Sequence, residues 1–248
     1  SVTQTERDKS IGDPRGIVWN AAGTRGYITG MGSNNLVVVD QNGDRVTTGA
    51  TTELREGPTG VILSADESRL FVVNRFDASI SVVDTTSLTE VANVPYFDPT
   101  PASIKTGRKH LYDTHKNSGL GQIACGSCHV DGRMDRLAWD LGDPSGSVKN
   151  LSGSGSPPQH NLGAGIPGLL EGGTSPAFTN FHPMKGPMTT QTLQDIIGKE
   201  PFHWRGDRDG LEEFNAAFMG LQGDDTMLTP QEMQEFEDFL ASTHFPPN

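Results

Sequence analysis

The apolar residues in the first third of the chain come in short alternating runs, the pattern of half-buried β-strands. Pro58 repeats Pro14 at a distance of 44 positions (58 − 14), and the neighbouring runs keep that distance without a gap. The paired runs are 13–19 with 57–63, 25–29 with 69–73, and 35–40 with 79–84. A gapless period of this length, with β-branched strands between Gly, Asn and Asp turns, is typical of β-propeller blades. The pattern predicts two blades within residues 1–95, after a polar segment at 1–12 that is either a tail or an incomplete strand.

The acidic residues Asp40 and Asp84 end the third strand of each predicted blade, where we expect them to cap turns. Two blades do not close a ring, because propellers have ~4–8 of them. An open pair would leave apolar faces and strand edges exposed. We therefore expect another chain, or another segment of a longer polypeptide, to complete the propeller.

Each repeat opens with P-x-G and three apolar residues, and its third strand ends in an apolar-x-V-x-D pattern. In these motifs the chain resembles bacterial YVTN-type β-propellers over roughly residues 13–95. The resemblance implies the same fold as the repeat, an incomplete all-β ring.

The composition changes after the repeats. Residues 96–103 form a proline-rich linker, because proline disfavours helices and central strands. Gly, His and Met become frequent beyond it, and 104–121 predicts a short helix with a Gly-terminated turn. A Gly-, Ser- and Pro-rich stretch at 140–180 predicts a long loop. Thr189 or Thr190 is a candidate cap for a short helix that continues through Ile197.

The clearest helix signal lies at the C-terminus. Thr229 fits the N-cap, Pro230 the first helical position, and Glu232 the third, which together make a capping box. The spacing of the following apolar residues predicts one buried stripe, made of Met233, Phe236, Phe239 and Leu240. His244 falls beyond this helix, where we expect it to be exposed.

Both cysteines of the chain lie in the run Cys125-Gly-Ser-Cys128-His129. C-x-x-C-H is the attachment signature for c-type haem: the two thiols form thioethers with the haem vinyl groups, and the histidine is the proximal iron ligand. Three alternatives compete. The cysteines could form a disulfide or a thioredoxin-like redox pair, or they could share a zinc ion with His110 and His115. The redox alternative leaves His129 unexplained, and the zinc alternative has an unusual ligand order.

The residues around the motif carry a second resemblance. The run G-R-K-H-L-Y-D…A-C-x-S-C-H-x-D-G-R is similar to the beginning of a haem domain of the bacterial di-haem cytochrome c peroxidase superfamily. We identify 104–248 as a mainly α, loop-rich, mono-haem cytochrome c domain, similar to those fused to YVTN propellers. The second C-x-x-C-H of the superfamily is absent, which argues against peroxidase chemistry.

The sixth iron ligand decides what such a haem does, because methionine raises its potential and an open site allows peroxide chemistry. Met188 follows His129 by 59 residues (188 − 129) in Gly-Pro-Met, and we expect it to be this ligand. The alternatives are Met184, His182 and His203. Met219 lies on an amphipathic segment and is expected in the core.

The resemblance also implies other haem contacts. Arg205 and Arg208 are expected to pair with the propionates, and Trp204 to pack on the haem edge. His203 is the candidate proton-transfer residue if the site is enzymatic. The carboxylates of 207–212 lack the spacing of an EF-hand, so we do not predict calcium there.

The formal net charge of −12 argues against binding to nucleic acid or to an anionic membrane. No apolar run approaches the ~18 residues of a membrane helix. Because haem is attached outside the cytoplasm, we expect a periplasmic or extracellular protein whose signal peptide has been removed.

Three functions follow as hypotheses. The first is electron transfer through one haem c to a redox partner protein, within a larger assembly. The second is a peroxidase- or oxidase-like enzyme, with His203 at an open or histidine-gated distal site. The third is a propeller-based binding module with a structural haem.

Overall fold

The computed structural model describes residues 2–46, 51–141, 149–150, 180–181, 187–204, 206 and 208–248. The chain forms two compact units, Ser1–Ala124 and Cys125–Asn248.

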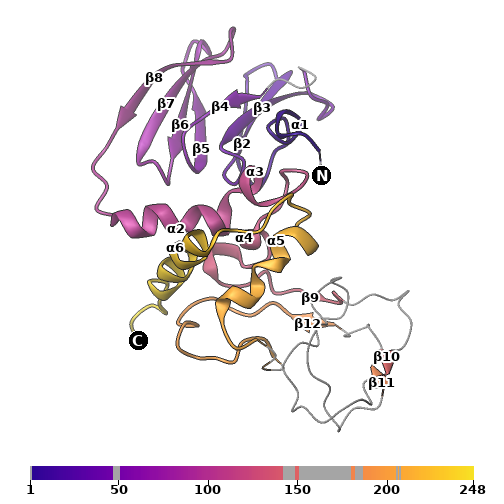
Figure 1. Cartoon of the computed structure of the whole chain (residues 1–248). Helices are drawn as coiled ribbons and strands as arrows, with labels where there is room; N and C mark the ends of the chain where they lie inside the picture. Colours follow the sequence, from indigo (N-terminus) through magenta and orange to yellow (C-terminus); the bar gives the residue numbers. More distant parts are fainter. Residues whose placement is uncertain are drawn as a thin grey trace. The chain divides into compact units, whose positions relative to one another are not determined.

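The first unit contains two antiparallel sheets of four strands each, in the orders β1-β2-β3-β4 and β5-β6-β7-β8 (Figure 1). Their strands are β1 (Pro14–Trp19), β2 (Arg25–Gly30), β3 (Asn35–Asp40), β4 (Thr52–Glu53), β5 (Pro58–Leu63), β6 (Arg69–Asn74), β7 (Ser79–Asp84) and β8 (Thr89–Pro95). This confirms the prediction of two successive all-β repeats that do not close. The first three strands of each sheet coincide with the repeated runs.

Apolar side chains of the two sheets pack on each other to form one core. The first sheet contributes Tyr27, Leu36 and Val38, and the second contributes Leu70, Val72 and Val83, all at most 3% exposed. Alternate residues of a strand point to opposite faces, so each sheet uses one face for this core. The other face of the second sheet remains outside it.

The two turn-capping aspartates were predicted correctly. Asp40 Oδ1 accepts hydrogen bonds from the backbone N–H groups of Asn42 (2.8 Å) and Asp44 (3.0 Å). Asp84 Oδ1 accepts them from Thr86 (3.0 Å) and Ser87 (2.8 Å). These bonds lower the pKa of Asp84.

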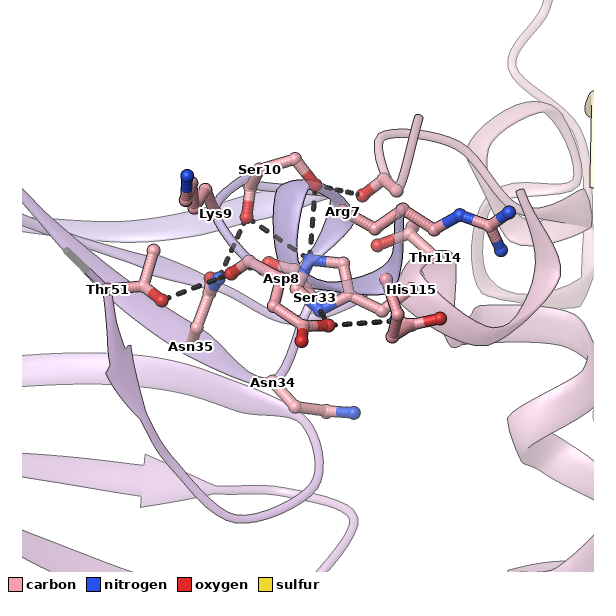
Figure 2. Close-up of polar contacts among 12 residues, drawn as sticks. Arg7, Asp8, Lys9, Ser10, Ser33, Asn34, Asn35, Thr51, Thr114 and His115 are labelled. Atoms are coloured by element: carbon pink, nitrogen blue, oxygen red, sulfur yellow. Dashed lines mark hydrogen bonds and ion pairs between the residues drawn. The ribbon is translucent and has the colours of Figure 1, made fainter. Parts of the chain in front are cut away.

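The N-terminal segment is more ordered than the predicted tail, because it forms helix α1 (Gln4–Arg7) and is bonded on both sides (Figure 2). Toward the first sheet, the Asn35 side chain donates to the Ser10 carbonyl at 2.8 Å. On the other side, the Ser10 hydroxyl donates to the Gly121 carbonyl at 2.6 Å and lies 3.1 Å from His115 Nε2. His115 Nε2 also faces the Ser10 carbonyl at 3.2 Å, so this nitrogen is the donor. We call Ser10, His115 and Gly121, which these hydrogen bonds join, the clamp.

Helices α2 (Ala102–Tyr112) and α3 (Thr114–Asn117) belong to the same unit as the sheets. The Arg108 guanidinium lies 4.7 Å from the centre of the Phe76 ring and donates to the Phe76 carbonyl. The Thr114 N–H donates to the Gly32 carbonyl at 2.8 Å. Because of these contacts, the compact units divide between residues 124 and 125, beyond the linker that we expected at 96–103.

The second unit contains short elements and one longer helix. They are α4 (Cys125–Cys128), the 3-10 helix η1 (Val130–Gly132), β9 (Ala138–Trp139), β10 (Lys149–Asn150), β11 (Asn180–Phe181), β12 (Met188–Thr189), the 3-10 helix η2 (Leu211–Phe214), α5 (Ala216–Gly220) and α6 (Pro230–Ala241). Strands β9 and β12 pair, as do β10 and β11. Most of the expected loop at 140–180 lies outside the described residues.

The C-terminal helix confirms its prediction in detail. Both hydrogen bonds of the capping box between Thr229 and Glu232 are present, and the four residues of the predicted stripe are buried. His244 is exposed and pairs with Asp195 at 2.7 Å. The prediction of a short helix through Ile197 is wrong. The backbone there forms hydrogen bonds outside the segment, and the Leu193 N–H donates to the Gly132 carbonyl at 2.9 Å.

In the part of the chain that the structure describes, no helix has the length and apolar character needed to cross a bilayer.

Candidate haem site

The C-x-x-C-H motif forms a single helical turn. Helix α4 spans Cys125–Cys128, and the His129 N–H donates to the Cys125 carbonyl at 2.9 Å. This turn holds two thiols and one imidazole within five consecutive residues. Both thiols are free, so the disulfide alternative is not realised here.

The imidazole of His129 is oriented by a backbone carbonyl. Its Nδ1 lies 2.8 Å from the carbonyl oxygen of Gln191. Because a carbonyl only accepts, Nδ1 carries the proton and Nε2 keeps its lone pair. Burial lowers the pKa of His129, and the bond to Gln191 opposes that shift. The ring is therefore held as a neutral imidazole, the form that binds a metal.

The two thiols lie in surroundings that disfavour thiolates. Burial raises the pKa of Cys125 to about 11, although the Gln222 side-chain amide, which donates to Cys125 Sγ at 3.3 Å, lowers it. Burial, and secondarily the charge of Asp135, raises the pKa of Cys128. A redox pair needs a stabilised thiolate, so thiols of raised pKa do not favour that alternative.

The zinc alternative finds no ligand cluster in the described part of the chain, where no three or more His, Cys, Asp or Glu side chains gather in a way that could hold a metal ion. His115 belongs to the clamp with Ser10, and His110 is fully buried in the first unit.

Strands β9 and β12 bring aromatic residues beside the predicted sixth ligand. Met188 is paired with Trp139 across the two strands and is half-buried. The Trp204 indole donates to the Thr189 carbonyl at 2.7 Å, and its side chain remains 62% exposed. The Trp204 indole is therefore held against the backbone of the residue that follows Met188.

Met188 lies three residues before Gln191, whose carbonyl orients His129. A segment of that length spans at most about 10 Å, so Met188 lies in the vicinity of the motif. Its role as the sixth ligand stays a prediction.

Met219 was expected in the core, and this prediction is wrong because the residue is 45% exposed on α5. Its neighbour Phe218 takes the core position instead, at 1% exposed. Gln222, three residues further on, contacts Cys125 Sγ. The exposed thioether of Met219 therefore belongs to a turn that reaches the motif.

His203 has a left-handed backbone (φ 65°) and packs edge-on against Phe214, with ring centres 4.8 Å apart. Its charge lowers the pKa of His129, so the two histidines lie within electrostatic range of each other. Arg208 is 4% exposed, and its carbonyl accepts from the Phe202 N–H at 2.7 Å. The structure thus brings His203 close to the motif and buries Arg208.

Several predicted residues lie outside the described part of the chain: His182, Met184, Arg205 and the first carboxylate of the 207–212 segment. Their proposed roles stay predictions.

Three residues near the motif were missed by sequence reasoning. Gln191 acts through its carbonyl, which leaves no signature in the sequence. Gln222 lies 97 positions from its partner Cys125, and only its place beside the exposed Met219 offers a signal. Asp135 accepts from the Trp139 indole at 2.8 Å and influences both Cys128 and His129.

These residues fit haem c. Two neutral thiols on one turn supply the thioether positions, and His129 offers an oriented Nε2 lone pair. Near the motif, Met219 and Trp204 are exposed apolar side chains that a large apolar group would cover.

Comparison with known proteins is limited to structure. No model of a known protein family matches the chain, and no curated protein matches it. It is similar to hydrazine synthase of Kuenenia stuttgartiensis at 24% identity over 36% of this chain and 25% of that one, with a TM-score of 0.33. It is also similar to the periplasmic gluconolactonase PpgL of Pseudomonas aeruginosa, at 13% identity over 36% and 27%, with a TM-score of 0.32.

A third solved structure, the dihydro-heme d1 dehydrogenase NirN in complex with DHE, matches at 13% identity over 32% of this chain and 16% of that one, with a TM-score of 0.25. The chain spans about a quarter of the length of the first of these structures. At such TM-scores the similarities support no argument about activity.

Proposed function

We propose that this chain is a periplasmic or extracellular c-type cytochrome that transfers electrons through one covalently attached haem. The observation that carries the proposal is the bond between His129 Nδ1 and the Gln191 carbonyl, directly after two neutral thiols. Such a bond fixes the tautomer and the direction of a metal-binding histidine and increases its basicity. Bound haem would supply the one-electron chemistry.

The residues of the chain have defined tasks in this proposal. Cys125 and Cys128 hold the haem, and His129 presents Nε2 to the iron. Gln222 positions the Cys125 sulfur through its amide. The carboxylate of Asp135 adds negative charge beside the site, which favours the oxidised form.

Met188 is proposed as the sixth ligand, from its spacing to His129 in Gly-Pro-Met. The alternatives Met184 and His182 lie outside the described residues, and His203 lies within electrostatic range of His129. In the haem-loaded protein, Met188→Leu should abolish the long-wavelength absorption band of methionine-ligated ferric haem. Met219→Leu, at an exposed methionine of α5, should retain it. The reverse result would assign the ligand to Met219, and a high-spin spectrum of the unaltered protein that shifts with peroxide would overturn electron transfer.

The peroxidase-like alternative is supported by one observation, the electrostatic coupling of His203 to His129. It is tested by His203→Ala, which would lower peroxide turnover in an enzyme and leave an electron-transfer protein unchanged. We also propose that the two sheets of the first unit are blades of an incomplete YVTN-type propeller that needs completion.

A further inference from the structure

The second sheet exposes an apolar face on the side that is not part of the core. Two rows of directly opposed residues cross it: Ile62, Phe71, Val82 and Ala92 in one, and Val73, Ile80 and Val94 in the other. Ile62 is 62% and Val94 55% exposed, and Phe71 and Val73 are 37% and 39% exposed. We call these seven residues the open face.

The repeat of 44 residues identifies what the open face corresponds to. At a distance of 44 positions, Phe71, Ile80 and Val82 are the repeat equivalents of Tyr27, Leu36 and Val38. Those three residues are at most 3% exposed because the second sheet covers them. The open face is thus the repeat equivalent of a surface that a neighbouring sheet covers within the same chain.

The covering surface also has an equivalent, on the first sheet. In the core, Val61 and Leu63 of β5 pack against the first sheet. Their equivalents are Ile17 and Trp19 of β1, which are 53% and 41% exposed. The chain therefore exposes both halves of an interface that it already forms once internally.

A glycine marks where the two backbones meet. A Cβ at Gly16 would lie 2.2 Å from the Thr59 carbonyl oxygen, so the internal interface needs a glycine there. Its equivalent is Gly60 on the open face, where a Cβ would meet only Val73, at 3.9 Å. Gly60 thus leaves the same space, and nothing within the second sheet requires it.

We infer that the open face binds the β1–β2 side of the first sheet of a second copy of this chain, head to tail. The contact is heterologous, so it closes only when enough copies complete a ring. With two repeats per copy and ~4–8 blades per ring, closure takes two to four copies. The inference rests on the propeller part of the proposed function and does not depend on haem.

The size of the face sets the expected strength. Four strands about 4.8 Å apart and six residues long at about 3.3 Å each give roughly 400 Å². Two such faces bury about 800 Å² in total, below the ~1,200–2,000 Å² of standard interfaces. A single contact is therefore expected to be weak, and ring closure strengthens it.

The test is sedimentation velocity of the full chain, with and without haem, up to about 1 mM. Ile62→Asp blocks the open face, and Ile17→Asp blocks the opposite side. Each variant alone should lose oligomers, with at least a tenfold weaker association. A mixture of the two keeps one intact contact and should stop at a 1:1 dimer. Gly60→Ala should weaken association by a similar factor, because its Cβ makes only an ordinary contact with Val73 within the chain and would meet the incoming backbone.

Leu120→Asp is the matched control, since it places the same charge on an apolar residue that is 57% exposed outside the open face. It should associate like the unaltered chain. A monomer at all concentrations, or equal loss of association in the control, would overturn the inference. Because the association of haem-free protein is also measured, this test of the open face remains valid even if the chain carries no haem.

Discussion

The half-buried thiol of Cys125 should react slowly with alkylating reagents in the haem-free chain. Burial raises its pKa to about 11, from an ordinary value of 9.0. At pH 8 this lowers the thiolate fraction about 100-fold. A thiolate of higher pKa is also more nucleophilic, by about tenfold over two pKa units. The native thiol should therefore be alkylated about tenfold more slowly than the same thiol in the unfolded chain.

The assay follows iodoacetamide labelling of a Cys128→Ala variant by mass spectrometry, in buffer and in urea. Steric protection would only increase the difference. Gln222→Leu provides a second check, because the amide that it removes lowers the pKa of Cys125. Labelling of the native thiol should become slower still in this variant. Native labelling faster than in urea would show instead that the fold stabilises the Cys125 thiolate, as in a redox pair.

Three further predictions concern stability. Leu70→Ala removes a side chain that is 0% exposed in the core between the sheets, and should lower the free energy of unfolding by about 2–5 kcal/mol in urea titrations; Ile62→Ala, at 62% exposed, is the control and should cost far less. Thr229→Ala breaks the capping box of α6 and should cost about 1 kcal/mol, with Gln231→Ala as the control. The raised pKa of Cys125 should make the haem-free chain less stable at high pH. The free energy of unfolding should be unaffected by this thiol below about pH 9 and should fall, by on the order of 2 kcal/mol, as the pH rises through 11. Cys125→Ser should remove this dependence on pH.

The features that could be predicted from the sequence are those determined by residues that lie close together along the chain. The 44-residue period predicted the strand pattern of both sheets because alternation and turn residues act over a few positions. The same holds for α6, whose capping box and apolar stripe lie within 12 residues.

The features that could not be predicted depend on contacts between distant residues. In place of the short helix expected through Ile197, the backbone forms hydrogen bonds to distant residues, such as the one from Leu193 to Gly132. No local sequence pattern predicts such hydrogen bonds. Helix α2 joins the sheets because Arg108 meets Phe76. In the candidate site, the orientation of His129 depends on a backbone carbonyl, which is common to every residue type.

Intact mass together with a visible spectrum shows whether Cys125 and Cys128 carry a haem. The chain is exported to a periplasm with haem-attachment machinery, purified, and compared with a Cys125→Ala/Cys128→Ala variant. We predict that the unaltered chain gains the mass of one haem, retained after denaturation, with the reduced spectrum of a c-type cytochrome, and that the variant gains none. A folded, exported chain with free thiols and no haem absorbance would show that the motif does not attach haem.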